Sequence, residues 1–438
     1  MQAQTSGKEN KIATFRKKIN HIIIIYQENW SFDGLYGKFP HANNLLTLDS
    51  NKFTQRSING EILTTVPQPI NDKNPDKNFP ESLPAKPYSL LNYINPDMRT
   101  GDLVHRFYTE QLQIDGGKMD KYAAYTDNSG LVLSYFDAYG LHFPEAELAA
   151  QYTLCDNFFH SAFGGSFLNH IFFISAAAPK WGNDLPEKYI SQPDTSKEKF
   201  KDNILTPDGY AVNTVYSVNT PRPKDKNDSS LLLPYQTMPT IGDRMNDAKV
   251  SWAWYSGGWN DALEGKDVHD NFQYHHQPFV YFENYKNGSA NKKIHLKDEA
   301  DFYAALRSGT LPAVSFIKPY GDFNEHPGYA SVFAGQQHVD SIIQLIKASK
   351  YWKDAIIIIA YDENGGRWDH VAPPKIDKWG PGTRVPAIII SPFAKRNFVD
   401  HTQYETVSIL KLIETRYKLK PLSTRDAKAN DLLNTLHF

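Results

Sequence analysis

Two runs of four isoleucines constrain the fold of this 438-residue chain more than any other feature. They lie in HIIIIYQENWSFDG at 21–34 and in AIIIIAYDENGGRWDH at 355–370. A continuous isoleucine run predicts a strand buried on both faces, as in a parallel sheet covered by helices. Each run ends in oxygen-bearing side chains, and ligands of open parallel sheets bind at the carboxyl edge. The sequence therefore predicts two halves of one site.

Strand-like runs alternate with helical patterns along the rest of the chain. The predicted strands are 21–26, 250–255, 312–317, 355–361 and 385–391. Apolar stripes predict helices at 338–355 and at about 404–417, the latter being the last helix expected. This alternation predicts an α/β fold with a large, mostly parallel central sheet and helices on both faces.

The domain organisation follows from where the periodicity stops. Residues 1–18 read as a polar N-terminal tail, and residues 19–438 as a single domain. Two segments within it, about 53–100 and 185–240, are rich in Pro, Asn, Asp and Lys and have weak periodicity. We interpret them as long surface excursions, and long ordered loops of this kind often cover active sites.

Composition excludes several classes of protein. A net charge of −2 and a pI near 6.7 argue against nucleic acid as the main partner. No segment approaches the roughly 20 apolar residues that span a bilayer. The single cysteine, Cys155, rules out a disulfide within the chain and fits either the cytosol or an exported protein. The N-terminus lacks an apolar core, as in a cytosolic protein or a mature form without its signal peptide.

The side chains after the two isoleucine runs predict a metal site. Glu28, Asn29, Asp362 and Glu363 all offer oxygen ligands, which suit one hard or borderline divalent cation. The alternative is that each acidic residue caps a helix or a turn, and that Asn29 forms a turn before SFDG. The repetition of the pattern after two buried strands favours the metal. Calcium, magnesium, manganese, zinc and iron all remain candidates.

A serine in SAFGGSFLNHIFF (161–173) is a candidate nucleophile. Two glycines precede Ser166 and a helix-capable apolar run follows it. This order predicts a serine near a helix N-terminus, where free N–H groups and the helix dipole favour an anion. The alternative is simple N-capping by the serine hydroxyl. The stretch departs from the GxSxG elbow, because Phe167 and Leu168 follow the serine.

Several histidines lie in polar, glycine-rich or aromatic settings among the 15 in the chain. Each of them taken singly is more often a hydrogen-bonded structural residue. If several converge, they supply cationic donors to a phosphate and a proton to a leaving group. The candidates are His105, His275, His276, His338 and His370.

Four motifs together resemble a known family. HIIIIYQENWSFDGLYG, DGGKMDKY, FGGSFLNH and YDENGGRWDHVAPP, in this order, resemble the bacterial acid phosphatase and phospholipase C family of phosphoesterases. That family belongs to the alkaline-phosphatase-like superfamily. The resemblance runs from about residue 19 to the last predicted helix and is weakest in the two excursions. It implies an alkaline-phosphatase-like fold and a metal-dependent hydrolase of phosphate esters that forms a phosphoserine.

The resemblance also implies roles for individual residues. Glu28, Asn29, Asp362 and Glu363 fall at metal-ligand positions, and Ser166 falls at the nucleophile, which is expected to bind the same metal.

The histidines take their roles from the same resemblance. His105 and His338 fall where contacts to the substrate phosphate are expected, and of the doublet His275–His276 we favour His276 as the catalytic residue. Histidines used as cations or acids would push activity toward acidic pH, because imidazole has a pKa of roughly 6.5. Substrate contacts are expected from Asn29, His275 and His370, with a local structural role as the alternative for His370 and its neighbour Asp369.

The substrate and compartment are expectations of the same kind. FGGSFLNH departs from the SPTNPNR-like stretch of phosphocholine-preferring members and is closer to the acid phosphatase branch. We expect a phosphate monoester or a phospholipid as substrate, with transient membrane contact through the aromatic stretches WAWYSGGW and YHHQPFVYFENY. A periplasmic or secreted location is expected, with the cytoplasm as the alternative.

Three other functions were weighed against these motifs. A non-catalytic phosphate- or headgroup-binding protein would need no nucleophile at Ser166. A sulfatase would need a C/SxPxR context, which Cys155 in LCDNFF lacks. A phosphoglycerate mutase would need a two-metal pattern rich in His and Asp, which these motifs do not provide.

Overall fold

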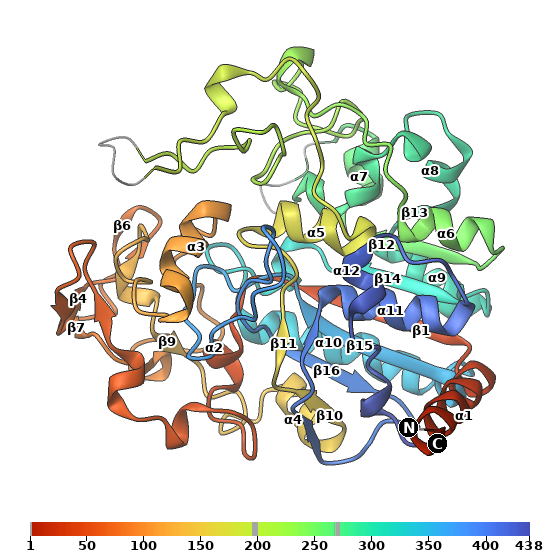
Figure 1. Cartoon of the computed structure of the whole chain (residues 1–438), viewed down its shortest axis with the longest axis horizontal. Coiled ribbons are helices and arrows are strands. Elements are labelled where there is room, and N and C mark those ends of the chain that lie inside the picture. Colours follow the sequence, from red (N-terminus) through yellow and green to blue (C-terminus); the bar gives the residue numbers. More distant parts are fainter. Residues whose placement is uncertain (1, 195–199, 267, 269–271) are drawn as a thin grey trace.

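An eight-stranded sheet forms the centre of the protein in the computed structural model, which describes residues 2–194, 200–266, 268 and 272–438 (Figure 1). The strand order is β13-β12-β14-β1-β15-β16-β10-β17. Only β16 runs antiparallel to its neighbours within this sheet. The mostly parallel sheet expected from the sequence is therefore confirmed. Its strands are β1 (His21–Gln27), β10 (Thr153–Cys155), β12 (Trp252–Ser256), β13 (Leu296–Asp298), β14 (Val314–Lys318), β15 (Ala355–Tyr361), β16 (Ala387–Ile390) and β17 (Phe398–Asp400).

The two isoleucine runs form the adjacent central strands β1 and β15, and all eight isoleucines are fully buried. The two strands pair in parallel from His21 opposite Ala355 to Gln27 opposite Tyr361. This register brings the next residues, Glu28 and Asp362, out of the sheet at the same edge and the same level. Strand β14 flanks β1 on its other side, in parallel, and ends there as well.

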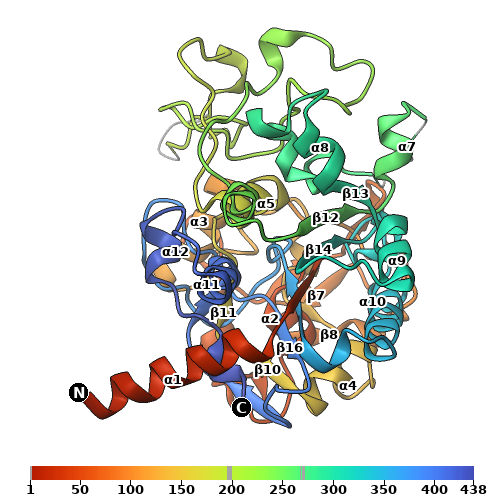
Figure 2. The ribbon, with the colours of Figure 1, turned by 90° about the vertical axis from the view of Figure 1, so that its right-hand side faces the viewer.

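Helices cover both faces of the sheet, which explains why its strands have no polar side (Figure 2). One face holds α1, α5 and α11, and the other holds α4, α9 and α10. Their bounds are α1 (Gln2–Lys18), α4 (Pro144–Gln151), α5 (Ser166–Ser175), α9 (Glu299–Ser308), α10 (Val332–Lys347) and α11 (Thr406–Tyr417). The remaining α-helices are α2 (Phe32–Tyr36), α3 (Phe107–Ile114), α6 (Ile241–Asp247), α7 (Trp259–Leu263), α8 (Ala290–His295) and α12 (Thr424–Lys428).

Three local expectations need correction. Residues 2–18, expected as a polar tail, form the continuous helix α1. The helix expected at 338–355 spans Val332–Lys347, because Ala355 already begins β15. The helix expected as the last one, α11, is followed by α12.

Short strand pairs outside the main sheet lie mostly in the 53–100 excursion. The excursion at 185–240 contains, in its described part, two 3-10 turns and no strand longer than an isolated bridge. Both segments therefore lack the periodicity of the core, as expected. The short strands are β2 (Gln55–Arg56), β3 (Ile62–Leu63), β4 (Thr65–Pro67), β5 (Ile70–Asn71), β6 (Asn74–Pro75), β7 (Ser82–Pro84), β8 (Tyr88–Ser89), β9 (Ser134–Tyr135), β11 (Phe158–Phe159) and β18 (Tyr404–Glu405).

The aromatic stretches expected to touch membranes lie in the interior. Trp252, Trp254 and Trp259 are buried, and so are Phe279 and Tyr285. These rings pack on one another and on the sheet, so they offer no apolar surface to a lipid. Within the described residues, no helix is both long and apolar enough to cross a membrane.

Candidate active site

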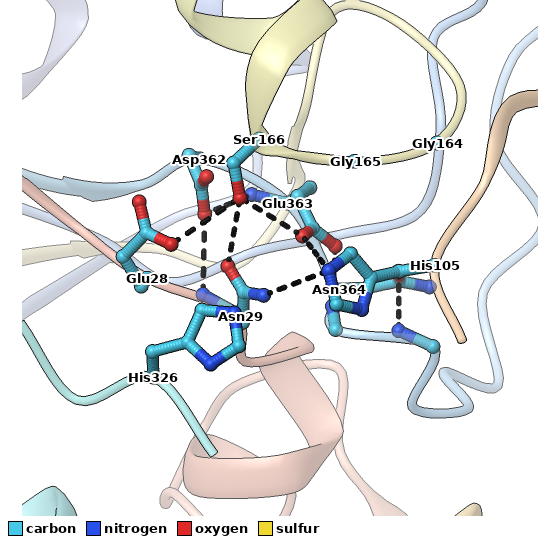
Figure 3. A network of polar contacts seen from close by, with 12 residues as sticks. Glu28, Asn29, His105, Gly164, Gly165, Ser166, His326, Asp362, Glu363 and Asn364 are labelled. Atoms are coloured by element: carbon cyan, nitrogen blue, oxygen red, sulfur yellow. Dashed lines mark hydrogen bonds and ion pairs between the residues drawn. The ribbon is translucent and has the colours of Figure 1, made fainter. Parts of the chain in front are cut away.

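The ends of β1 and β15 bring four oxygen-bearing side chains together, as the sequence predicts (Figure 3). Glu28, Asn29, Asp362 and Glu363 are all fully buried. The backbone N–H of Asn29 donates to Asp362 Oδ1 at 3.1 Å, which joins the two strand ends. Asn29 adopts a left-handed conformation with φ of 60°, which asparagine tolerates better than most residues. The turn that an asparagine favours is thus present, and its side chain also faces the cluster.

Ser166 is the first residue of α5, and its hydroxyl points at this cluster (Figure 3). Its Oγ lies 3.2 Å from Glu28 Oε2, 3.3 Å from Asn29 Oδ1 and 3.4 Å from Glu363 Oε1. The N-cap residue of the helix is Gly165, and the cap makes no side-chain hydrogen bond. The capping alternative for this serine is therefore wrong.

Two glycines press the serine loop against the segment that contains His105. Gly164 has φ of +84°, and a Cβ there would lie 2.5 Å from the backbone nitrogen of Phe107. A Cβ on Gly165 would lie 2.8 Å from the carbonyl oxygen of His105. Neither approach tolerates a side chain, so the glycines fix how close the serine lies to the histidine.

A buried ion pair holds the same loop from behind. Glu110 on α3 accepts the Gly164 N–H at 2.6 Å and contacts His160 Nε2 at 2.9 Å. The other ring nitrogen of His160 lies 2.8 Å from the carbonyl oxygen of Ala162. Burial alone would lower the pKa of His160, but the Glu110 carboxylate outweighs it and raises the pKa. Both ring nitrogens then donate, and the loop is fixed at two points before Ser166.

The site contains more negative than positive charge. Lys318, the last residue of β14, forms an ion pair with Glu28, and His276 Nε2 lies 2.9 Å from the same carboxylate. Burial opposes ionisation of Glu28, yet His276 and Lys318 hold its pKa well below the ordinary value. Burial, reinforced by Glu28, raises the pKa of Asp362 to about 8, and burial with Asp362 raises that of Glu363 well above its ordinary value. Three buried carboxyls facing one lysine need a further cation to stay ionised.

The donors around this charge fit a divalent metal ion. Within the described residues, Asp362 Oδ2 and His170 Nε2 are buried without a hydrogen-bond partner. His170 Nδ1 lies 3.8 Å from Asp362 Oδ2, and Glu28, His170 and His276 can each place a ligand atom within 4.8 Å of the others. Carboxylate, amide and imidazole donors together suit borderline ions such as zinc, iron and manganese as well as harder ones.

His105 and His326 face each other across the front of the cluster, with ring centroids 5.7 Å apart. His105 Nε2 lies 3.3 Å from Asn29 Nδ2 and 3.6 Å from Glu363 Oε1. His105 is among the histidines predicted from the sequence, whereas His326 is not. The predicted strand at 312–317 was the one available signal, because the residues after a parallel strand emerge at the carboxyl edge of the sheet, and β14 does lie in parallel beside β1.

The doublet is divided between two positions. His275 lines the cleft, whereas His276 lies behind it against the Glu28 carboxylate. Burial lowers the pKa of His276 to about 4. The structure thus brings both histidines to the site, with the favoured His276 beside a candidate metal ligand and His275 at the surface of the cleft.

Two predicted histidines are not brought to the site. His338 on α10 pairs with Glu299 Oε1 at 2.6 Å and stacks on Phe323. Its expected contact with phosphate is therefore not supported by its position.

His370 belongs to a separate buried network, so its expected substrate contact is not supported either. Its Nδ1 lies 2.7 Å from Asp33 Oδ2, and Arg384 donates to both Asp33 and Asp369. This network ties the motif at 21–37 to the motif at 361–374, which is the local structural role given as the alternative for His370 and Asp369.

A cleft of about 690 Å³ opens onto the serine hydroxyl. The 185–240 excursion forms part of its wall through Asn203, Ile204, Asn213 and Thr214. This excursion lies above α5 in Figure 1 and borders the site. The lining of the cleft includes Glu28, His105, Ser166, His275 and His326.

The arrangement has the features of a hydrolase: a buried serine at a helix N-terminus, with acidic groups and histidines around one cleft. The family model described as "Phosphoesterase family" matches residues 19–420. The chain therefore belongs to the phosphoesterase family and is a hydrolase acting on phosphoric ester bonds.

Curated relatives agree over almost the whole chain. Phospholipase C B of Mycobacterium tuberculosis is 24% identical over 96% of this chain and 78% of its own length. The non-hemolytic phospholipase C of Pseudomonas aeruginosa is 22% identical over 96% of this chain, which spans 58% of that relative. A solved protein of the alkaline phosphatase superfamily from Vibrio parahaemolyticus overlaps 67% of this chain and 64% of its own, at 10% identity and a TM-score of 0.36. This last overlap is too small to support a conclusion.

The glycine at 164 provides a first test of the site. Gly164→Ala should push Ser166 away from the carboxylates, because the new Cβ meets the Phe107 backbone. A displacement of this size should lower kcat/KM for a phosphate ester by about a hundredfold. Gly60→Ala is the matched control, since Gly60 has φ of +89° and no atom within 4 Å of its Cβ position. Equal activity loss in both variants would mean that backbone strain, and not the serine position, is responsible.

Proposed function

We propose that this protein hydrolyses phosphate esters with Ser166 as the nucleophile, next to one divalent metal ion. The observation that supports this most directly is the Ser166 hydroxyl, which lies within 3.2–3.4 Å of oxygens of Glu28, Asn29 and Glu363. The hydroxyl donates into the acidic cluster, and it also lines the cleft, where it can meet a substrate. A serine that attacks phosphorus needs this position.

The metal would be held by Glu28, Asn29, Asp362 and Glu363 beside Ser166, with His170 and His276 within reach of the same cluster. When bound, a divalent ion would lower the pKa of the serine hydroxyl and neutralise charge on the phosphoryl oxygens. The excess of buried carboxylates supports such an ion, and its identity stays open.

The protein's own groups position the phosphate. Free N–H groups at the start of α5 and the helix dipole favour an anion in front of Ser166. His105 Nδ1 is bound to the Leu103 carbonyl oxygen, and His326 Nδ1 to that of Pro327. These bonds leave Nε2 of each ring as the nitrogen available to the substrate.

The reaction then proceeds in two displacements. Ser166 gives its proton to Glu28 Oε2, which accepts from it at 3.2 Å, as Ser166 Oγ attacks phosphorus. The ester P–O bond breaks, and the leaving alcohol takes a proton from an imidazolium of the His105–His326 pair. Water then cleaves the phosphoserine and releases inorganic phosphate or a phosphorylated headgroup. The protein contributes mainly positioning and charge to both steps.

The proposed substrate class is broader than the phospholipids that the names of the relatives indicate. Those relatives are named phospholipases C, and a cleft of about 690 Å³ accommodates more than a phosphate. The nucleophile stretch FGGSFLNH favours monoesters, as in the acid phosphatase branch that the sequence resembles. Phospholipid diesters are the second candidate, and export to the periplasm or the medium stays a prediction of the sequence.

A paired assay separates the two substrate classes. p-Nitrophenyl phosphate and p-nitrophenylphosphorylcholine are hydrolysed side by side from pH 4 to 9. Monoester turnover should exceed that of the choline ester, and Ser166→Ala should lower kcat at least about a thousandfold. Ser341→Ala, on an exposed part of α10, is the control. Faster cleavage of the choline ester would indicate a phospholipase C, and full activity in Ser166→Ala would exclude the nucleophile.

The metal has its own test, which needs no turnover. Asp362→Asn removes one charged ligand and should reduce the metal measured by mass spectrometry in the purified protein, with little change in circular dichroism. Asp97→Asn, at an exposed position, should keep the wild-type metal content. Unchanged metal in Asp362→Asn would contradict the proposed ligand set.

His326, which lies at the site, and His338, which lies away from it, provide a third test. His326→Gln should lower kcat/KM for the monoester by about a hundredfold, as expected for loss of a general acid or a phosphate contact. His338→Gln should stay close to wild type, because His338 pairs with Glu299 away from the cleft. The reverse pattern would restore the assignment made from the sequence.

A further inference from the structure

Two buried carboxyls lie beneath the site and have no part in the proposed chemistry. Glu145 on α4 and Glu325 in the loop after β14 both have 0% of their surface exposed. The hydroxyl of Tyr361, the last residue of β15, bridges them. It lies 3.0 Å from Glu145 Oε2 and 2.7 Å from Glu325 Oε2.

This bridge requires a proton on one of the carboxyls. The Tyr361 hydroxyl has one hydrogen and can donate it to only one of the two oxygens. The other short contact needs a hydrogen from the carboxyl itself. Among the described residues, no lysine or arginine is hydrogen bonded to either group, and the further partners are the amides Gln27 and Gln336. Two buried carboxylates without a cation do not both ionise.

The groups that face the pair from each neighbouring element make ionisation harder. Tyr36 on α2 and Tyr361 on β15 are neutral, and Asp340 on α10 is negative. Burial, followed by Glu325, raises the pKa of Glu145 well above its ordinary value, and burial raises the pKa of Glu325 to about 7.

The pair lies one residue away from three parts of the site. Gln27, which donates to Glu325 Oε1 at 2.9 Å, precedes Glu28. Tyr361 precedes Asp362, and Glu325 itself precedes His326. Gly335 on α10 allows the approach, because a side chain there would clash with Glu325 Cγ. The ends of β1, β14 and β15 are thus joined through one hydrogen-bonded cluster.

We propose that Glu145 and Glu325 share one proton in the active protein and that this protonated pair positions the three strand ends around Ser166. Both are positioning residues and touch no substrate. When the shared proton is lost, two adjacent carboxylates repel each other and displace the residues next to them. Activity and stability therefore both fall at the alkaline pH at which the pair loses this last proton, in addition to any effect of the histidines.

The direction of the stability change follows from linkage. A carboxyl with a raised pKa in the folded state keeps its proton longer there than in the unfolded chain. Its contribution to stability is full below the ordinary value of 4.5. Part of it is lost as the pH rises through about 7, where Glu325 ionises, and the rest at higher pH, because the pKa of Glu145 is raised further. The stability measurement does not depend on the proposed reaction, whereas the activity measurement rests on it.

Glutamine variants test the proposal, because glutamine imitates the protonated carboxyl in shape and charge. Glu325→Gln, Glu145→Gln and the double variant are compared with wild type at pH 5, pH 8 and pH 10, using kcat for p-nitrophenyl phosphate and the melting temperature. Glu325, with a pKa of about 7, is largely ionised at pH 8, and Glu145 gives up the remaining proton at higher pH because its pKa is raised further. The variants should match wild type at pH 5 and should lose less activity than wild type between pH 8 and pH 10, by up to about tenfold for each pH unit above the pKa of Glu145. Their melting temperatures should also fall less over the same range.

Glu147→Gln is the control, since Glu147 lies on the same helix with its side chain half exposed and paired with His142. It should reproduce the wild-type profiles. Wild-type pH profiles of activity and melting temperature in the pair variants would overturn the proposal. So would loss of folding or activity at pH 5, where the proposal requires the neutral form. If neither wild type nor variants cleave phosphate esters, the proposed function fails, while the melting temperatures still decide the shared proton.

Discussion

The in-register pairing of β1 with β15 is the constraint on which the rest of the site depends. Isoleucines fill both strands, and helices cover both faces of the sheet. Neither strand can therefore shift its register without misplacing all four of its isoleucines. That register sets Glu28 level with Asp362. The sheet thereby holds acidic groups close together although they repel each other. Only a rigid core can maintain such an arrangement.

Buried carboxyls are stabilised in two different ways within this one region. Around Ser166, three carboxyls face Lys318 and a set of imidazoles, which is an arrangement that accepts a cation. Beneath them, Glu145 and Glu325 have amide and hydroxyl partners only, which is an arrangement that accepts a proton. The proposed metal ion and the proposed shared proton would thus solve the same electrostatic problem, in the site and in its support.

The isoleucine runs were sufficient to predict the central strands and the four oxygen donors after them, because burial on both faces leaves a strong local pattern. Strands β10, β13 and β17 have three residues each and show no such pattern, so tertiary pairing alone defines them. The family resemblance assigns a phosphate contact to His338 and gives no role to His326. His338 lies on α10, where it pairs with Glu299, and the resemblance could not reveal this.

The order of the strands in the sheet explains why the sequence does not predict Lys318 and His326 as residues of the site. The chain places β14 some 290 residues after β1, yet the sheet places it directly beside β1. Every parallel strand in the middle of the sheet must deliver its next residues to the same edge. The third central strand therefore contributes as the first two do: β1 and β15 provide the acids, and β14 provides a lysine that balances them and a histidine that faces His105. A site of this kind is defined by strand ends that are neighbours in space. A motif in the sequence marks only some of those ends.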